Sequence, residues 1–161
     1  MRAGYERVDG LDEVLRRLRE LSARTAVFDI EPLIAFWDSG QEALDGGVAR
    51  VVSQAARVPS LEVLCFATNS ARQPSVVPGT EGVRVIYLAS AGKPMRLPPY
   101  RDFPGPGVVI GDQVATDGIL ARRLDYAFVQ YLPRREVVPA GPRLMGRLGW
   151  LVRPVIFRRP G

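Results

Sequence analysis

Histidine is absent from this chain of 161 residues, and cysteine and lysine occur once each, as Cys65 and Lys93. The lack of histidine excludes Ser-His-Asp triads, Cys-His pairs and zinc sites of the HExxH type. A single cysteine excludes an internal disulfide and zinc sites built from several cysteines. Any chemistry must therefore depend on carboxylates, hydroxyls, amides and cations.

Long hydrophobic runs are also lacking. No apolar run approaches the ~18 residues of a membrane span, and the N-terminal segment has no apolar stretch typical of a signal peptide. We therefore expect a soluble, cytoplasmic protein. The length of the chain and its 47% content of hydrophobic residues suit one globular domain with a substantial core.

Positive charge is concentrated near the C-terminus. Residues 131–161 contain seven arginines and one acidic residue, whereas residues 1–130 contain 15 basic and 16 acidic residues. Residues 133–161 therefore form a basic extension that contains prolines and aromatic residues, and residues 1–132 form the predicted domain. We expect the extension either to dock on the domain or to form a surface arm.

Apolar segments alternate with amphipathic ones along residues 11–132. The predicted strands are apolar throughout, which is typical of parallel sheets covered on both faces. The pattern predicts a three-layer α/β fold with a mostly parallel, five-stranded sheet. Asp9 is the expected N-cap of the first helix. The predicted helices span 11–22, 41–57 and 114–124, and the predicted strands span 25–29, 61–68, 83–89, 107–112 and 126–132.

Polar residues stand where several of these predicted strands end. Ligands of an open parallel sheet bind at the carboxyl ends of its strands, so we expect these side chains to lie close together. Hard oxygen donors suit Mg²⁺, and an ammonium group balances the charge of a phosphate. The pattern therefore favours a site for Mg²⁺ and a phosphate. The residues concerned are Asp29, Thr68, Asn69, Lys93, Asp112 and Asp117.

Four short motifs follow one another along the chain: FDIE (28–31), ATNS (67–70), AGKP (91–94) and GDQVATDG (111–118). In this order they resemble the motifs of the haloacid dehalogenase (HAD) superfamily of phosphatases. The combination of KP and GDQxxTD is most similar to the YqeG-type branch, which includes phosphatidylglycerophosphate phosphatases. The resemblance covers residues 25–132 and implies a Rossmann-like fold and Mg²⁺-dependent hydrolysis of a phosphomonoester.

The resemblance also implies catalytic roles. Asp29 would be the nucleophile that forms an aspartyl-phosphate. Glu31 would be the general acid and base that protonates the leaving group and activates water. Thr68 and the amide of Asn69 would bind phosphoryl oxygens, and Lys93 would neutralise the charge shared by the nucleophile and the phosphate.

The metal ligands implied by the resemblance are Asp29, the backbone carbonyl of Glu31, Asp112 and Asp117. A second interpretation of Asp117 is an acidic residue at the N-terminus of a helix, where the helix dipole stabilises its negative charge. Cys65, inside a predicted strand, is expected to lie in the core. The segments between motifs are too short for an inserted domain, so we expect no cap domain over the site.

The first motif departs from the usual DxDxT, because Asp29-Ile30-Glu31-Pro32-Leu33 stands in its place. Two hypotheses therefore stay open. The first is a phosphatase acting on a phosphatidylglycerophosphate-like or other phosphorylated substrate. The alternative is a catalytically weakened or inactive HAD-like module that binds a partner protein or an anionic membrane, at its inner face, through residues 133–161. We see no nucleic-acid-binding motif.

Overall fold

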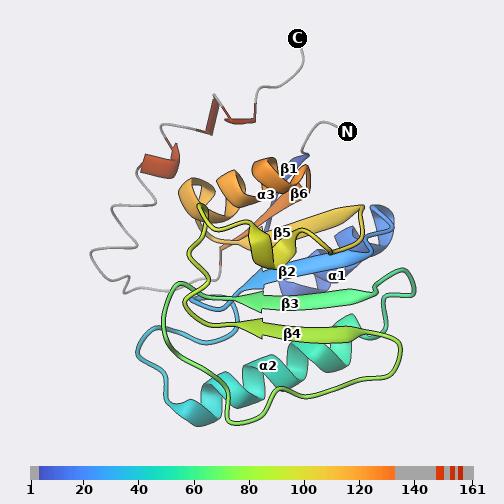
Figure 1. Cartoon of the computed structure of the whole chain (residues 1–161), viewed down its shortest axis with the longest axis vertical. Coiled ribbons are helices and arrows are strands. Elements are labelled where there is room, and N and C mark those ends of the chain that lie inside the picture. Colours follow the sequence, from blue (N-terminus) through green and yellow to red (C-terminus); the bar gives the residue numbers. More distant parts are fainter. Residues whose placement is uncertain (1–3, 133–147, 151–152, 155, 158–161) are drawn as a thin grey trace.

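The computed structural model describes residues 4–132, 148–150, 153–154 and 156–157. They form an α/β fold around one six-stranded sheet (Figure 1). In chain order the elements are β1 (Tyr5–Val8), α1 (Leu11–Glu20), β2 (Thr25–Asp29), α2 (Gln41–Ala55), β3 (Val63–Ala67), β4 (Arg84–Leu88), the 3₁₀-helix η1 (Pro98–Tyr100), β5 (Gly107–Gly111), the π-helix η2 (Val114–Gly118), α3 (Ile119–Leu124) and β6 (Ala127–Tyr131).

The strands follow the order β1-β6-β5-β2-β3-β4, and every neighbouring pair is parallel. From β2 the chain moves outward through β3 to β4, and it then returns to β5 on the other side of β2. The connections therefore change direction between β2 and β5. In open α/β sheets such a switch point is where ligands bind, at the carboxyl ends of the strands.

Two apolar clusters cover the two faces of the sheet, so the fold has three layers. Successive residues of a strand point to opposite faces, and Phe28 joins the cluster under α1 and α2 while Val27 joins the cluster under η1 and α3. The same alternation places Phe66 with the first cluster and Cys65 with the second. This arrangement confirms the prediction of a parallel α/β fold.

Helix α2 packs tightly against the segment that follows β2. A Cβ atom on Gly47 would lie 2.3 Å from the carbonyl oxygen of Ile34, whereas a Cβ on the neighbouring Gly46 would meet nothing within 4 Å. The absence of a side chain at position 47 therefore lets the helix approach this loop. The contact fixes the path of the chain just after Asp29.

The sheet differs from the expected one in its strand count. We predicted five strands, but β1 adds a sixth, paired in parallel with β6. Its short sequence, Tyr-Glu-Arg-Val, carries two charged residues and has no apolar run, because an edge strand exposes more of its side chains than a central one. The pattern that identified the central strands could therefore not identify this one.

Two helical predictions also need correction. Residues 114–124 form η2 followed by α3 instead of one α-helix. Gly10, not Asp9, is the N-cap of α1, and no side chain caps this helix; instead the Asp9 N–H donates to Glu13 Oε2 at 2.9 Å. Asp12 and Glu13, the acidic residues of the first turn, interact favourably with the positive end of the helix dipole.

The connections near the site are short. Residues 30–62 hold α2, and residues 68–83 hold only a loop with an isolated bridge, so neither of these described segments contains a further domain. Residues 89–106, where five prolines fall between positions 90 and 106, form only η1 and loop.

Most of the predicted extension 133–161 lies outside the described residues. In its described part, Phe157 stacks on Phe128 of β6 with ring centroids 5.7 Å apart, and its ring centroid is 5.3 Å from that of Tyr5 in β1. The extension is therefore docked at this point on the edge formed by β1 and β6. Within the described part of the chain, no helix has both the length and the apolar character needed to cross a membrane.

Candidate functional site

The candidate site lies at the switch point between β2 and β5. Asp29 is the last residue of β2, and Asp112 directly follows β5. Because the two strands are hydrogen-bonded neighbours in parallel, their carboxyl ends bring these carboxylates to the same edge. Together with Asp117, they offer carboxylate oxygens that all lie within 4.8 Å of one another.

Lys93 connects two of these carboxylates. Its Nζ donates to Asp29 Oδ1 and to Asp117 Oδ1, each at 2.7 Å, and its side chain is 3% exposed. The loop after β4 delivers the lysine, and Asn69 holds this loop in place: the Lys93 N–H donates to Asn69 Oδ1 at 2.8 Å, and Asn69 Nδ2 donates to the Lys93 carbonyl at 2.9 Å. Asn69 thereby positions the only lysine of the chain.

Asp117 is fully buried in η2, directly above the end of β5. A Cβ atom on Gly111 would lie 2.2 Å from Asp117 Oδ2, so the glycine leaves the space that the carboxylate occupies. The Gln113 N–H also donates to Asp117 Oδ2, at 3.3 Å. The GDQVATDG segment (111–118) therefore folds back so that the carboxylate of Asp117 lies close to that of Asp112.

The electrostatics of the cluster are dominated by burial and by repulsion between carboxylates. Burial, with the charge of Asp117, raises the pKa of Asp29 well above its ordinary value. The same two causes raise the pKa of Asp112 to about 7. Burial alone would lower the pKa of Lys93, but the charges of Asp117 and Asp29 outweigh it and raise this pKa.

The cluster has the donors and the charge that a hard divalent cation requires. Three carboxylates that bind a cation as anions, beside one ammonium, would present it with two negative charges to balance. In addition, Asp112 Oδ1 is buried and has no hydrogen-bond partner among the residues that the structure describes, although buried acceptors are normally paired. An oxygen-only donor set of this charge suits Mg²⁺. The residues therefore fit the cation that the sequence predicts.

Glu31 is held away from the carboxylate cluster. Its Oε2 accepts a hydrogen bond from Thr68 Oγ1 at 2.6 Å, and its Oε1 accepts one from Ser70 Oγ at 3.1 Å. The Glu31 carboxylate is not among the oxygens that converge with Asp29. Two residues given catalytic roles by the resemblance, Glu31 and Thr68, thus bind each other in this structure.

Arg72 closes this second group of residues. Its Nη1 lies 3.6 Å from Glu31 Oε1 and donates to the Phe36 carbonyl at 2.9 Å, while its Nη2 donates to the Ser39 carbonyl at 2.9 Å. The guanidinium therefore ties the loop after β3 to the loop after β2, the two loops that carry Thr68 and Glu31. Both loops leave the same edge of the sheet.

The structure brings the predicted residues together in two adjoining groups. One group contains Asp29, Lys93, Asp112 and Asp117, and the other contains Glu31 and Thr68. Ser70 and Arg72 complete the second group and were not predicted. The Thr-Asn-Ser string contained the only signal for Ser70, and nothing in the sequence distinguishes Arg72 from the other arginines.

Cys65 lies in β3 below this edge and is fully buried, as expected. Burial raises the pKa of its thiol to about 12, so the thiol stays protonated near neutral pH. It therefore takes no part in the site.

Comparison of the chain with protein-family models, with curated proteins and with solved structures gave no match.

Proposed function

We propose that the protein is a Mg²⁺-dependent phosphomonoester hydrolase of the HAD type that acts through an aspartyl-phosphate on Asp29. The main support is the cluster at the switch point, in which carboxylate oxygens of three aspartates lie within 4.8 Å and one lysine bridges two of them. This arrangement combines a nucleophile, a cation site and a fixed positive charge. The resemblance of the four motifs supports the same reaction.

Asp29 has one carboxylate oxygen, Oδ1, engaged by Lys93 and by the Ile30 N–H at 2.9 Å. The other oxygen is therefore the one that attacks phosphorus, forming an acyl-phosphate while the bond to the leaving-group oxygen breaks. Lys93 favours the ionised form of Asp29 against the opposing effects of burial and Asp117, and it offsets negative charge that develops on the phosphoryl group.

Glu31 is assigned the proton transfers. It gives a proton to the departing oxygen in the first step and takes one from water in the second, when water attacks phosphorus and releases inorganic phosphate and the Asp29 carboxylate. This assignment requires the Glu31 side chain to leave Thr68 and Ser70. The Thr68 hydroxyl would then be free to bind a phosphoryl oxygen.

Mg²⁺ would be held by Asp29, Asp112 and Asp117, with the Glu31 backbone carbonyl as the further ligand implied by the resemblance. When bound, it would supply positive charge that neutralises the phosphate and orients it toward Asp29. The unpartnered Asp112 oxygen is the observation in favour of this assignment.

The substrate is proposed to be a phosphatidylglycerophosphate-like lipid or another phosphorylated molecule in the cytoplasm. The absence of a further domain in residues 30–62 and 68–83 supports a bulky substrate, because nothing in these segments forms a cover. The expected binding of residues 133–161 to an anionic membrane concerns mostly residues outside those that the structure describes.

Two observations favour the alternative, a HAD-like module with weak or no catalysis. The short contact between Glu31 and Thr68 occupies both groups, and Leu33, buried in the core, stands where the family has a threonine. Such a module would keep the cation site but lack a working acid and base. It would act by binding a partner protein or a membrane.

Hydrolysis of an aryl phosphate, measured with Mg²⁺ and with EDTA, separates these proposals. We expect Mg²⁺-dependent turnover that Asp29→Asn reduces by at least about a thousandfold, since the nucleophile is lost. Asp102→Asn, in an exposed loop, is the matched control and should keep full activity. No turnover, with a melting temperature that still rises on adding Mg²⁺, would favour the non-catalytic module, and the absence of that rise would also contradict the cation site.

A further inference from the structure

Large apolar side chains are exposed beside the candidate site. Met95 is 75% exposed and lies two residues after Lys93 in the loop that follows β4. Trp150 is 70% exposed and belongs to the helical turn 148–150. This turn packs on η2, the element of Asp117, because a Cβ on Gly149 would lie 3.2 Å from the Ala115 nitrogen. Both apolar side chains are thus carried by segments attached to the site.

Helix α3 connects these two segments through neighbouring arginines. Arg123 Nη1 donates to the carbonyls of Pro94 and Met95, at 2.7 and 3.2 Å. Arg122 Nη1 donates to the carbonyl of Ile156, at 2.6 Å, in the C-terminal segment. The loop after β4 and the segment with Trp150 therefore flank the same unit, η2 and α3, as Figure 1 also shows.

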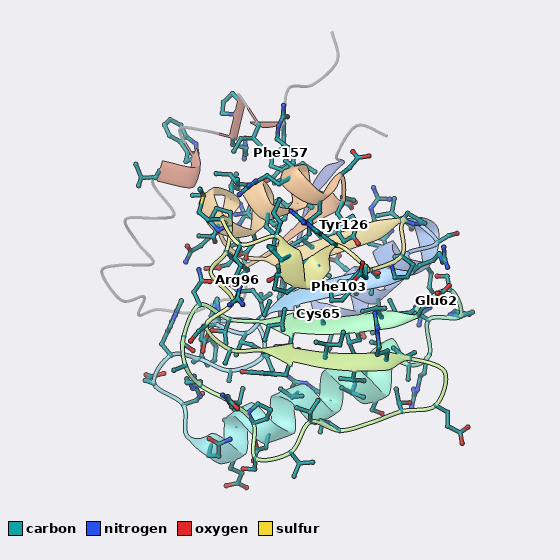
Figure 2. The ribbon with its side chains drawn as sticks, viewed as in Figure 1. Glu62, Cys65, Arg96, Phe103, Tyr126 and Phe157 are labelled. Carbon is teal, nitrogen blue, oxygen red and sulfur yellow. The ribbon has the colours of Figure 1, made fainter. Side chains whose placement is uncertain are left out.

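The exposed surface around these side chains carries three arginines. Arg96, Arg122 and Arg123 are exposed, and none of the ion pairs formed among the described residues involves them. Arg96 lies at the end of the sheet toward which β3 and β4 point, whereas Glu62 lies at the opposite end (Figure 2). We call this surface the rim; it consists of Met95, Arg96, Arg122, Arg123, Leu148 and Trp150.

We propose that the rim binds the surface of an anionic lipid bilayer and turns the site edge of the sheet toward it. Moving Trp and Met side chains from water into the interfacial region of a bilayer is favourable, and the negative surface potential of the bilayer attracts arginines. Charge alone would serve an acidic protein or a nucleic acid equally well. The exposed Met95 and Trp150 favour a lipid surface, because these apolar side chains are costly to leave in water. Docking does not depend on catalysis.

Trp150 provides a direct reporter of docking. The chain has two tryptophans, so Trp37→Phe leaves Trp150 as the only one. With vesicles of mixed phosphatidylcholine and phosphatidylglycerol, we expect its emission to shift to shorter wavelength, and with phosphatidylcholine alone we expect no shift. The same emission with both kinds of vesicle would overturn the proposal.

Sedimentation with the same vesicles tests the rim against a matched surface. The double variant Met95→Ser with Trp150→Ser should weaken binding to anionic vesicles by about tenfold or more. Val76 and Val77 are also exposed but lie in the loop after β3, next to α2, so Val76→Ser with Val77→Ser should bind as the unaltered protein does. Both double variants should keep the melting temperature, because the replaced side chains are exposed.

Three outcomes would contradict the rim as a membrane surface. The first is equal vesicle binding by both double variants, which would place the contact elsewhere. The second is tighter binding to an RNA duplex than to anionic vesicles, which would identify a nucleic acid as the partner. The third is equal binding to neutral and anionic vesicles. Hydrolysis of a soluble aryl phosphate, measured in parallel, should be unchanged in the rim variant, so failure of docking and failure of catalysis are distinguishable.

Discussion

Single residues determine the chemistry of this site, and Lys93 shows how. The lysine is buried between Asp29 and Asp117, and its ammonium group keeps two carboxylates close together that would otherwise repel each other. A third carboxylate, Asp112, has no such partner within the described part of the chain, and its pKa is raised to about 7. The cluster is therefore balanced either by protons or by a cation.

This competition between protons and a cation predicts a pH-dependent effect of Mg²⁺ on stability. A raised pKa means that folding favours the protonated carboxyl, so the contribution of Asp112 to stability is present below its unfolded pKa, about 4, and is lost as pH rises through about 7. Mg²⁺ needs the ionised form. We expect Mg²⁺ to raise the melting temperature more at about pH 8 than at about pH 5.5.

Thermal unfolding of the purified protein at the two pH values, with and without Mg²⁺, measures this difference. Asp112→Asn should abolish most of the effect of Mg²⁺, whereas Asp102→Asn should preserve it. An equal or larger effect at the lower pH would mean that these carboxylates do not hold the ion.

The sequence predicts some residues of the site better than others. Asp29 and Asp112 could be predicted because each stands at the end of an apolar strand, and chain order alone places such ends at one edge. The pairing of Glu31 with Thr68 and Ser70 could not, because side-chain rotamers decide it after the loops have formed. Arg72 could not be predicted either, since its partners are backbone carbonyls of a distant loop.

Elements position the site through close backbone contacts, and α2 is an example. Its two adjacent glycines have opposite environments: the space beside Gly46 is open, and Gly47 faces the Ile34 carbonyl. Gly46→Ala should therefore stabilise the protein by about 0.5–1 kcal/mol, because alanine reduces the conformational freedom of the unfolded chain and favours the helix.

Gly47→Ala should instead destabilise the protein by about 1–3 kcal/mol, because the methyl group would push α2 away from the loop after β2. Chemical denaturation of both variants measures the two free energies of unfolding. The same sign for both would show that α2 does not pack on this loop as described. Since the loop follows Asp29, a lower rate of the proposed hydrolysis is also expected in Gly47→Ala than in Gly46→Ala.

Strands that are buried along their whole length were easier to predict from the sequence than strands that are partly exposed. The central strands β2, β3 and β5 are buried along their whole length and stand out as apolar runs. Strand β1 escaped prediction because its pairing with β6 leaves three of its four residues partly or fully exposed. The boundary between η2 and α3 was also missed, because the π-helix depends on the Gln113 carbonyl accepting from residues further along the turn, and not on apolar periodicity.

For the whole molecule, the order of the strands links the candidate cation site to the rim. After β4 the chain passes β3 and β2 to reach β5. The loop with Lys93 and Met95 follows β4, and the η2–α3 unit follows β5. Because the strands are parallel, both segments leave the same edge of the sheet. The C-terminal segment returns to this unit and packs Phe157 on β1 and β6. The candidate site and the exposed apolar side chains of the rim therefore lie at the same end of the fold.

The central claim is that Asp29 accepts a phosphoryl group with Mg²⁺ beside it. Beryllium fluoride forms a stable mimic of an acyl-phosphate on such a carboxylate, and ¹⁹F NMR of the protein with Mg²⁺ and beryllium fluoride detects it without any need to know the substrate. We predict bound fluoride resonances that require Mg²⁺ and disappear in Asp29→Asn. Free fluoride species alone, in a protein whose melting temperature still rises with Mg²⁺, would contradict the claim and leave a cation-binding module without this catalysis.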